Sequence, residues 1–283
     1  MSYPSISVAR SKLPRTGAVA ALLFAAAAAH AQSAVQSADT LRFPYVAALS
    51  RSTSGERVYF CAGTLVAPRW ILTAAHCFHT PHGGLITAQG LAVEVGARRL
   101  REVPIHAQVA VARIVIHPDY DPESQDNDIA LVELAEEAGP LIAQVAMSRP
   151  AADPEQATVL GFGSFYEGRL AATALSRTGA PVSQTSDRLR QAVVRVVDPA
   201  ACAARMGGGG GSAGAYQICG GGGPDATCVG DSGGPLVVEG DDRTDRVAGI
   251  VSLGTGCAAD RPVTIYTRVS AYAGWIAETI RGR

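Results

Sequence analysis

The sequence predicts an all-β protein built from antiparallel β-barrels or sandwiches. After Leu41, short apolar runs alternate with turn residues, which is the pattern of short strands joined by tight connections. The chain contains 31 glycines and 16 prolines, as a fold with many turns requires. Its 283 residues suffice for one large or two medium domains with hydrophobic cores.

Eleven runs are predicted to be strands, because each is short, apolar and bounded by turn signals. They are Tyr45–Leu49, Gly63–Val66, Trp70–Thr73, Ala92–Val95, Val109–Ile116, Ile129–Leu134, Ala157–Leu160, Leu189–Val197, Gly234–Val238, Val247–Leu253 and Thr264–Arg268. A helix is predicted from Ser270 to Arg281, where apolar residues recur at helical spacing. A short helix is predicted to open at Asp198, with this residue as its N-cap.

The first 31 residues are predicted to be a secretory signal peptide. A positively charged segment from Arg10 to Arg15 precedes an apolar run from Gly17 to Ala29, and Ala29-His30-Ala31 has the A-x-A cleavage pattern. We therefore expect cleavage before Gln32 and a secreted or periplasmic protein. The apolar run is short for a membrane span, so no membrane association is expected once the signal peptide is removed.

All six cysteines follow this segment. An even number of cysteines in an exported chain favours disulfides over metal binding. Six cysteines allow 15 pairings, of which the chain-order set closes two short loops and one longer loop. This set is Cys61–Cys77, Cys202–Cys219 and Cys228–Cys257.

The composition excludes some classes of function. With 47% hydrophobic and 17% charged residues, the chain is typical of a globular protein, and its net charge of −1 indicates no nucleic-acid partner. His79 and His82 lie on a turn containing proline and glycine and form only a weak ligand pattern. No metal and no cofactor are expected.

The segment Gly230–Pro235 carries the strongest indication of function. Its sequence, Gly-Asp-Ser-Gly-Gly-Pro, contains three glycines and a proline, so it forms neither an ordinary strand nor a helix. A tight turn of this kind can hold the hydroxyl of Ser232 outward while backbone N–H groups point at one spot. This is typical of a nucleophile beside an oxyanion hole; the alternative is a glycine-rich loop that contains a serine by chance.

A serine nucleophile needs a base that takes its proton and an acid group that orients the base. His76 is the candidate base, because an apolar strand ends in Thr73-Ala74-Ala75 and presents it beside Cys77; a structural histidine is the alternative. Asp128 is the candidate acid. It directly precedes an apolar strand, where a carboxylate must accept several hydrogen bonds, and the His76 imidazole and the Ser252 hydroxyl are suitable donors.

With these residues the chain resembles the trypsin/chymotrypsin family of secreted serine endopeptidases, from roughly Phe43 to the end. Three motifs carry the resemblance in the order His, Asp, Ser: Thr73–Cys77, Asn127–Val132 and Gly230–Pro235. Further matches are Phe43-Pro44-Tyr45, His117-Pro118-Asp119-Tyr120, Gly161-Phe162-Gly163, Ser252-Leu253-Gly254 and Trp275-Ile276. The six cysteines also fall where three disulfides of the family would place them.

The resemblance implies two six-stranded antiparallel β-barrels packed across a catalytic cleft, with a C-terminal α-helix. Residues 32–145 would form the first barrel and carry His76 and Asp128. Residues 146–283 would form the second barrel and carry Ser232.

The resemblance also assigns roles around the nucleophile. The N–H groups of Gly230 and Ser232 would form the oxyanion hole, and Ser252-Leu253-Gly254 would pair, strand-like, with the substrate backbone. Leu253 stands where the family usually has tryptophan. Protein or peptide substrates and protein inhibitors are the expected partners, and a monomer is expected.

The specificity pocket departs from the trypsin pattern. Trypsin-like members carry aspartate six residues before the nucleophile, where this chain has Ala226, followed by Thr227. With Gly254 and Thr264 as further walls, we expect a neutral pocket for small or medium apolar residues. The alternative is that Asp225 reaches the pocket and selects arginine or lysine.

The activation pattern is the second departure. Family members free an Ile-Val-Gly-Gly-type terminus whose amine pairs with the aspartate before the serine, here Asp231, but this chain has no such motif. Counting back from Pro44 by the family spacing reaches Gln32, so signal cleavage itself is expected to create the terminus. The missing motif also leaves open a non-catalytic relative that keeps the fold as a binding protein.

Overall fold

The structure is a computed structural model of the 283-residue chain. It describes residues 36–38, 42–53, 56–80, 83–97, 99–102, 108–138, 144–145, 156–163, 186–206, 215–221, 231–240, 244–255 and 263–282. The predicted signal peptide lies outside these ranges, and so do eight other residues singled out in the sequence: Gln32, His82, Asp225, Ala226, Thr227, Cys228, Gly230 and Cys257.

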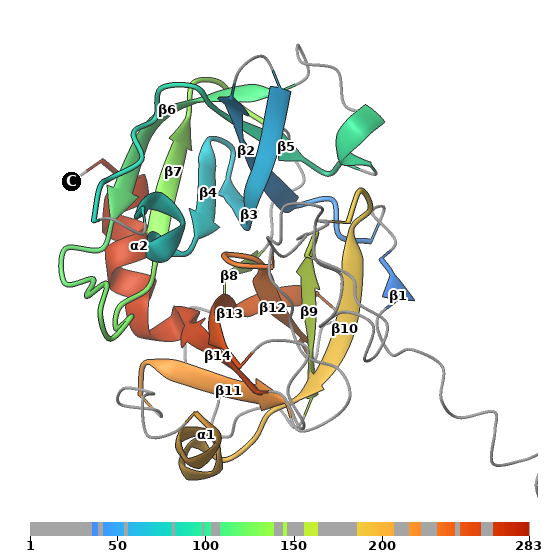
Figure 1. The fold of residues 1–283 in the computed structure, drawn as a ribbon, viewed down its shortest axis with the longest axis vertical. Coiled ribbons are helices and arrows are strands. Elements are labelled where there is room, and N and C mark those ends of the chain that lie inside the picture. Colours follow the sequence, from blue (N-terminus) through green and yellow to red (C-terminus); the bar gives the residue numbers. More distant parts are fainter. Residues whose placement is uncertain are drawn as a thin grey trace, which may run out of the picture. The chain divides into compact units, whose positions relative to one another are not determined.

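Six antiparallel strands close the first barrel (Figure 1). Around the barrel their order is β2-β3-β4-β7-β6-β5. Their bounds are β2 Val46–Thr53, β3 Glu56–Ala67, β4 Trp70–Thr73, β5 Leu91–Val95, β6 Val109–Ile116 and β7 Ala130–Leu134. Short 3₁₀ turns follow β4 (Ala75–Phe78) and β5 (Leu100–Glu102).

Six further strands form the second barrel, in the order β10-β9-β12-β13-β14-β11. An isolated bridge between Val196 and Gly220 joins the two ends of this series, so the prediction of two six-stranded barrels is confirmed. The strands are β9 Gln156–Gly161, β10 Arg190–Arg195, β11 Gln217–Gly221, β12 Pro235–Glu239, β13 Asp245–Gly254 and β14 Val263–Arg268. The two-residue strands β1 (Gln36–Ser37) and β8 (Gln144–Val145) add to β10 and β13.

Two short helices accompany the barrels. Helix α1 (Pro199–Arg205) opens as predicted, with the N–H of Ala200 donating to Asp198 Oδ1 at 2.9 Å. The predicted single C-terminal helix is instead a 3₁₀ turn, Val269–Tyr272, that leads into α2, Ala273–Ile280. Such tighter turns are frequent at helix ends. No helix in the described part of the chain is both long and apolar enough to cross a membrane.

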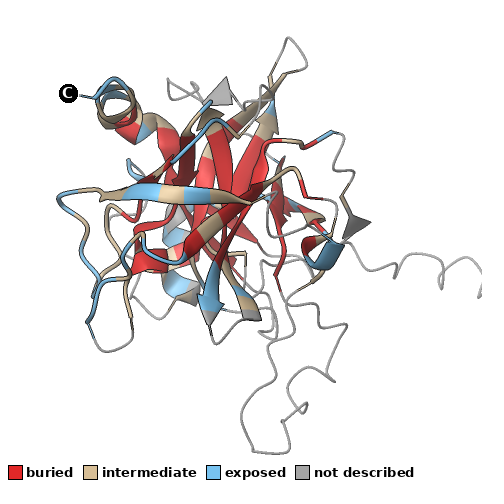
Figure 2. Cartoon of the chain, turned by 90° about the horizontal axis from the view of Figure 1, so that it is seen from above, coloured by how far each residue is buried: buried red, intermediate tan, exposed pale blue. Residues whose placement is uncertain are grey.

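The buried residues lie mainly on the strands, whereas the connections are more exposed (Figure 2). The largest apolar cluster extends from the first barrel to residues of β9, β12 and β13 and to the C-terminal helix. Hydrogen bonds also cross between the barrels: the Ala62 N–H donates to the Ser232 carbonyl at 2.8 Å, and Thr267 Oγ1 donates to the Asp128 carbonyl at 2.8 Å. The barrels therefore meet at the residues singled out for chemistry.

Two disulfides follow the chain-order pairing. Cys61 joins Cys77, and Cys202 joins Cys219, each with a Cα–Cα separation of 6.2 Å. The first ties β3 to the turn after β4, and the second ties α1 to β11.

Candidate active site

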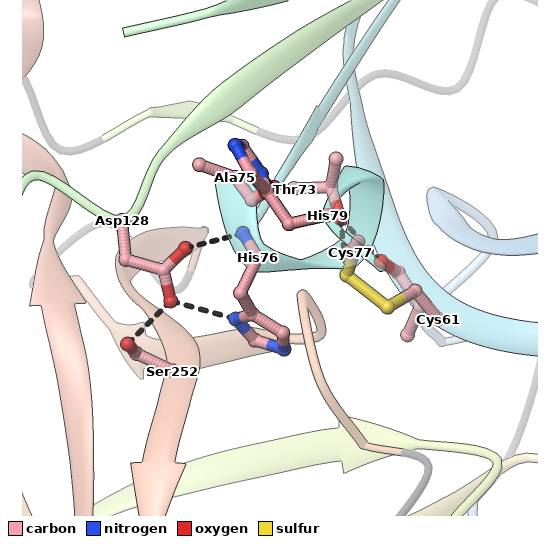
Figure 3. Close-up of a disulfide and its surroundings, with 9 residues drawn as sticks. Cys61, Thr73, Ala75, His76, Cys77, His79, Asp128 and Ser252 are labelled. Atoms are coloured by element: carbon pink, nitrogen blue, oxygen red, sulfur yellow. Dashed lines mark hydrogen bonds and ion pairs between the residues drawn. A yellow bond between two sulfur atoms is a disulfide. The ribbon is translucent and has the colours of Figure 1, made fainter. Parts of the chain in front are cut away.

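His76 is held at the end of a buried strand. Strand β4 is entirely buried, and the chain then turns tightly through Ala75–Phe78. The next residue, Cys77, is anchored to Cys61 by the disulfide (Figure 3). The imidazole side chain keeps 20% of its surface exposed, so its backbone is fixed while its ring reaches the surface.

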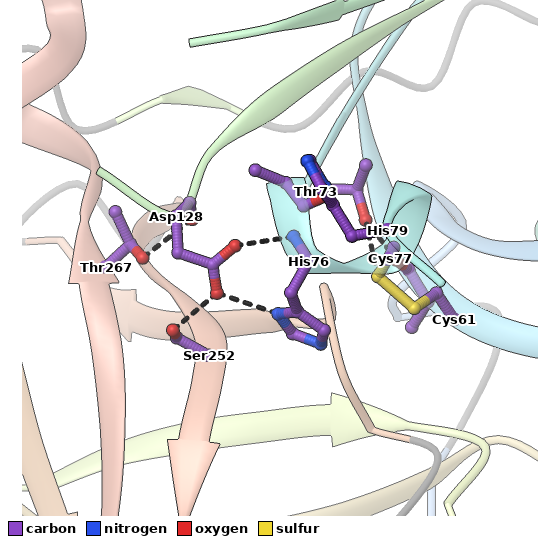
Figure 4. Close-up of polar contacts among 10 residues, drawn as sticks. Cys61, Thr73, His76, Cys77, His79, Asp128, Ser252 and Thr267 are labelled. Carbon is purple, nitrogen blue, oxygen red and sulfur yellow. Dashed lines mark hydrogen bonds and ion pairs between the residues drawn. A yellow bond between two sulfur atoms is a disulfide. The ribbon is translucent and has the colours of Figure 1, made fainter. Parts of the chain in front are cut away.

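Asp128 lies directly before β7 and its side chain is 1% exposed. Its Oδ1 accepts the His76 backbone N–H at 2.9 Å, and its Oδ2 pairs with His76 Nδ1 at 2.7 Å (Figure 4). The hydroxyl of Ser252, on β13, donates to Oδ2 at 2.5 Å. The two donors expected from the sequence, the His76 imidazole and Ser252, are thus both present, and they satisfy a carboxylate that is costly to bury unpaired.

This pairing sets the protonation chemistry of His76. Burial lowers the pKa of the imidazole, but the charge of Asp128 and its hydrogen bond outweigh burial and raise the pKa above the ordinary 6.5. When the ring is neutral, the carboxylate favours the tautomer with the proton on Nδ1, because a carboxylate only accepts. Nε2 then remains as a proton acceptor.

The Ser232 turn is clamped between the two barrels. The Ser232 carbonyl accepts the Ala62 N–H from β3, and the Gly233 N–H donates to the Val251 carbonyl of β13 at 2.9 Å. Gly233 adopts φ +77°, and a Cβ at this position would overlap Thr73 Oγ1, so only glycine fits here. The turn therefore has a defined conformation at the serine.

His76 and Ser232 both line one open pocket of about 280 Å³. The structure thus brings the predicted base and the predicted nucleophile to the same cavity. The pocket is also lined by Cys61 and Cys77. Ligating atoms of Cys61, His76 and Cys77 lie within 4.8 Å of one another, but both sulfurs are committed to a disulfide and are not available as thiolate ligands.

Asp231, the predicted activation residue, is partly buried against the end of β9. The Gly163 N–H donates to Asp231 Oδ1 at 2.8 Å, and a Cβ on either Gly161 or Gly163 would overlap the carboxylate. Burial, followed by the negative charge of Asp231, raises the pKa of Tyr59 well above its usual value, while a hydrogen bond from the Phe162 backbone lowers it. The Asp231 carboxylate therefore lies close to Tyr59.

The motif Gly161-Phe162-Gly163 owes its two glycines to this close approach. The resemblance to the trypsin/chymotrypsin family includes this motif but assigns it no role. Glycines at the end of a strand often mark a place where another group approaches the backbone closely. The two glycines at the end of β9 could therefore have indicated this contact from the sequence.

The residues expected around the substrate form one edge of the second barrel. Ser252, Leu253 and Gly254 end β13, and Gly254 lies opposite Thr264 on β14. Thr264 is 2% exposed, and a Cβ on Gly254 would come within 3.2 Å of its Oγ1. Leu253 packs with the buried cluster around Val263. The other predicted members, Ala226, Thr227 and the oxyanion donor Gly230, lie outside the described residues.

Comparisons with known proteins agree with this architecture. The trypsin family model matches residues 34–276. Coagulation factor XII of Sus scrofa is 35% identical over 255 residues, which cover 83% of this chain and 37% of that protein. Trypsin Blo t 3 of Blomia tropicalis is 32% identical over 243 residues, covering 82% of this chain and 80% of that protein. Human tissue-type plasminogen activator is 32% identical over 260 residues, covering 86% and 44%.

The match therefore spans 37% of the length of factor XII but most of trypsin Blo t 3. Because the family model covers most of the chain and relatives above 30% identity align along more than four-fifths of it, this chain belongs to the trypsin family of serine proteases.

Proposed function

We propose that the protein is an exported serine endopeptidase that hydrolyses peptide bonds through an acyl-enzyme. Ser232 is the nucleophile, His76 the general base and Asp128 the group that orients the base. The observation that carries the proposal is the buried Asp128 carboxylate, which engages both the backbone and Nδ1 of a histidine that shares a pocket with Ser232.

In this mechanism His76 Nε2 takes the proton of Ser232 Oγ as the oxygen attacks the scissile carbonyl. The tetrahedral oxyanion is stabilised by the N–H groups of Gly230 and Ser232, and each such donor contributes about 3 kcal/mol to lowering the barrier. His76 then gives the proton to the departing amine. Water repeats the sequence on the acyl-enzyme and regenerates Ser232. Asp128 stabilises the transient imidazolium throughout.

The proposal includes an organisation of the chain: a signal peptide over residues 1–31, a first barrel over 32–145 and a second barrel over 146–283. The amine freed at Gln32 would pair with Asp231. Support for this pairing comes from the partly buried position of the Asp231 carboxylate between the end of β9 and Tyr59, where a positive charge would be attracted to the carboxylate.

We also propose that the enzyme cleaves after small or medium apolar residues. The buried Thr264 side chain lies beside Gly254 at the end of β13, and Ala226 supplies no charge. Cleavage after arginine or lysine, using Asp225, is the competing specificity.

Reaction with a fluorophosphonate probe tests the nucleophile. We expect stoichiometric labelling of the mature protein and none of Ser232→Ala, because only an activated serine attacks the phosphorus. Ser270→Ala, in the 3₁₀ turn before α2, is the matched control and should label like wild type. A well-folded wild-type protein that does not react would identify a non-catalytic binding protein and overturn the proposal.

The pH dependence tests the role of Asp128. Since His76 must be neutral to act, kcat/KM should fall as the pH decreases through a pKa above 6.5. Asp128→Asn removes both influences that raise this pKa and leaves burial, so the acid limb should move to lower pH. The rate should also drop by about 10⁴-fold, the size of this effect in proteases with such a triad. The control is Asp119→Asn at an exposed residue, which should leave the acid limb of the pH profile unchanged. If the acid limb does not move in Asp128→Asn either, the role assigned to Asp128 is contradicted.

Peptide anilides that differ only in the residue before the scissile bond test the specificity. We expect alanine and valine to exceed arginine and phenylalanine in kcat/KM by at least about tenfold, the effect of a few methylenes in a closed pocket. Thr264→Gly should raise kcat/KM for the phenylalanine substrate relative to the alanine substrate. Asp225→Ala should leave the ratios of kcat/KM between the substrates unchanged. A preference for arginine that disappears in Asp225→Ala would establish the competing specificity.

Mass spectrometry of the protein exported by a producing cell tests the maturation proposal. We expect the mature chain to begin at Gln32, with the amine of this residue available to Asp231. A mature start several residues away would contradict both the cleavage site and the pairing, without affecting the labelling experiment.

A further inference from the structure

The pocket shared by His76 and Ser232 extends over the Cys61–Cys77 disulfide rather than toward Asp128. In Figure 3 the histidine stands between Asp128 and Ser252 on one side and the disulfide on the other. None of Ser252, Leu253 and Gly254, the proposed binding edge for the acyl part of the substrate, lines this pocket. The cavity is therefore a separate part of the cleft.

Apolar side chains form the walls of the pocket. Val58 and Phe60 of β3 and Ile86, from the connection before β5, all line it. Val58 is 50% exposed, and Leu85, which precedes Ile86, is 63% exposed. Exposed apolar groups gathered around a cavity next to reactive side chains are typical of a surface that a ligand covers.

Among the described residues that line the pocket, one carries a permanent charge, the guanidinium of Arg51. This residue is exposed on β2 and lies opposite Val58 of β3. Within the described part of the chain, no hydrogen bond or ion pair engages its side chain, whereas Arg57, Arg69 and Arg113 of the same barrel each pair with a carboxylate. Of the lining residues that the structure describes, none is an aspartate or a glutamate. The pocket thus combines apolar walls with an available positive charge.

The rim of the pocket is preformed. His79 Nδ1 lies 3.3 Å from the Ala75 carbonyl oxygen, and its ring packs in a tilted arrangement against Tyr120, with 5.0 Å between centroids. Cys61 and Cys77 are fixed by their disulfide. A ligand therefore meets an ordered surface and loses little free energy to reorganisation.

The direction of the substrate follows from the proposed function, on which this step rests. The acyl part is bonded to Ser232 and lies along Ser252–Gly254. His76 delivers its proton to the departing amine, so the chain that bears this amine leaves on the other side of the imidazole, over the Arg51 pocket.

We infer that this pocket selects substrates with a carboxylate in the first two residues after the scissile bond, and that Arg51 is the specificity-determining residue. The apolar walls accommodate the methylene stem, and the guanidinium pairs with the carboxylate. The carboxylate belongs either to a glutamate or aspartate side chain or to the C-terminus of a short leaving peptide. An exposed ion pair of this kind gives a preference of up to about fivefold, which salt reduces.

Acyl transfer to added amines isolates this side of the cleft. The acyl-enzyme is formed from an activated ester, and water and a dipeptide compete for it. When the dipeptide attacks, the bond between the acyl carbon and Ser232 Oγ breaks, an amide bond forms, and the amine proton passes through His76 to Oγ. The ratio of aminolysis to hydrolysis then measures binding of the leaving part alone, independent of the specificity before the scissile bond.

The nucleophiles are Glu-Ala-amide, Ala-Glu-amide, their glutamine counterparts, Ala-Lys-amide and Ala-Gln with a free carboxylate. We expect at least one glutamate peptide, or the free carboxylate, to exceed its neutral counterpart by about three- to fivefold at low salt and by less at 1 M NaCl. A gain with the glutamate amides assigns the side-chain source. A gain confined to the free carboxylate assigns the peptide terminus.

Arg51→Glu should reverse the preference among the nucleophiles, so that Ala-Lys-amide gives the highest ratio of aminolysis to hydrolysis. Arg51→Gln should abolish the preference for a carboxylate. The matched control is Arg195→Glu, an exposed arginine on β10 outside the pocket, which should keep the wild-type order. Equal transfer to glutamate, glutamine and free-carboxylate nucleophiles, or an order unchanged in both Arg51 variants, would overturn the inference while the proposed function stands. If no acyl-enzyme forms, the proposed function itself fails.

Discussion

The organisation of the site depends on the burial of one carboxylate. The Asp128 side chain is 1% exposed, and an ionised group so deep is stable only if donors surround it. Those donors come from three places: the backbone and ring of His76, and the hydroxyl of Ser252. Because Ser252 belongs to the second barrel and Asp128 to the first, satisfying this charge also fixes how the two barrels meet.

The backbone around Asp128 adds to the same junction. Thr267 of β14 donates to the Asp128 carbonyl, and Tyr272 donates its phenolic proton to Asn127 Oδ1 at 3.0 Å. Asn127 itself adopts φ +55°, a conformation that asparagine tolerates better than most residues. The C-terminal turn thus holds the strained residue beside the carboxylate, so a segment far away in sequence contributes to the geometry of the proposed triad.

Much of the fold and of the proposed site could be predicted from local sequence, because the patterns that indicate them are confined to short segments. Strands β4 and β6 have the predicted bounds, since each is an apolar run with clear limits. Strand β11 was not predicted, because two of its five residues are glycines, which usually weaken a strand. The fold explains one of them: a Cβ on Gly220 would come within 2.9 Å of the Tyr266 ring.

The pocket over the disulfide could not be predicted from the sequence, because its lining residues are far apart along the chain. Arg51, Phe60, His79 and Ile86 lie in different segments and carry no motif, so only the closure of the first barrel brings them together. The close approach of Asp231 to the end of β9 is similar, because its two flanking glycines precede it by about 70 residues. A motif predicts functional groups that lie close together in the sequence. A cavity is formed by several segments that only the complete fold brings together.

The division of the proposed triad between two barrels couples chemistry to the completion of folding. A chain with only the first barrel assembled has His76 and Asp128 but neither Ser252 nor the serine. A chain with only the second has Ser232 in a turn that lacks the supporting N–H of Ala62. On the proposed mechanism neither half has a complete catalytic unit, so a partly folded molecule would not cleave its neighbours. For a protease this architecture protects the chain during synthesis, when unfolded copies of the same chain are the nearest available substrates.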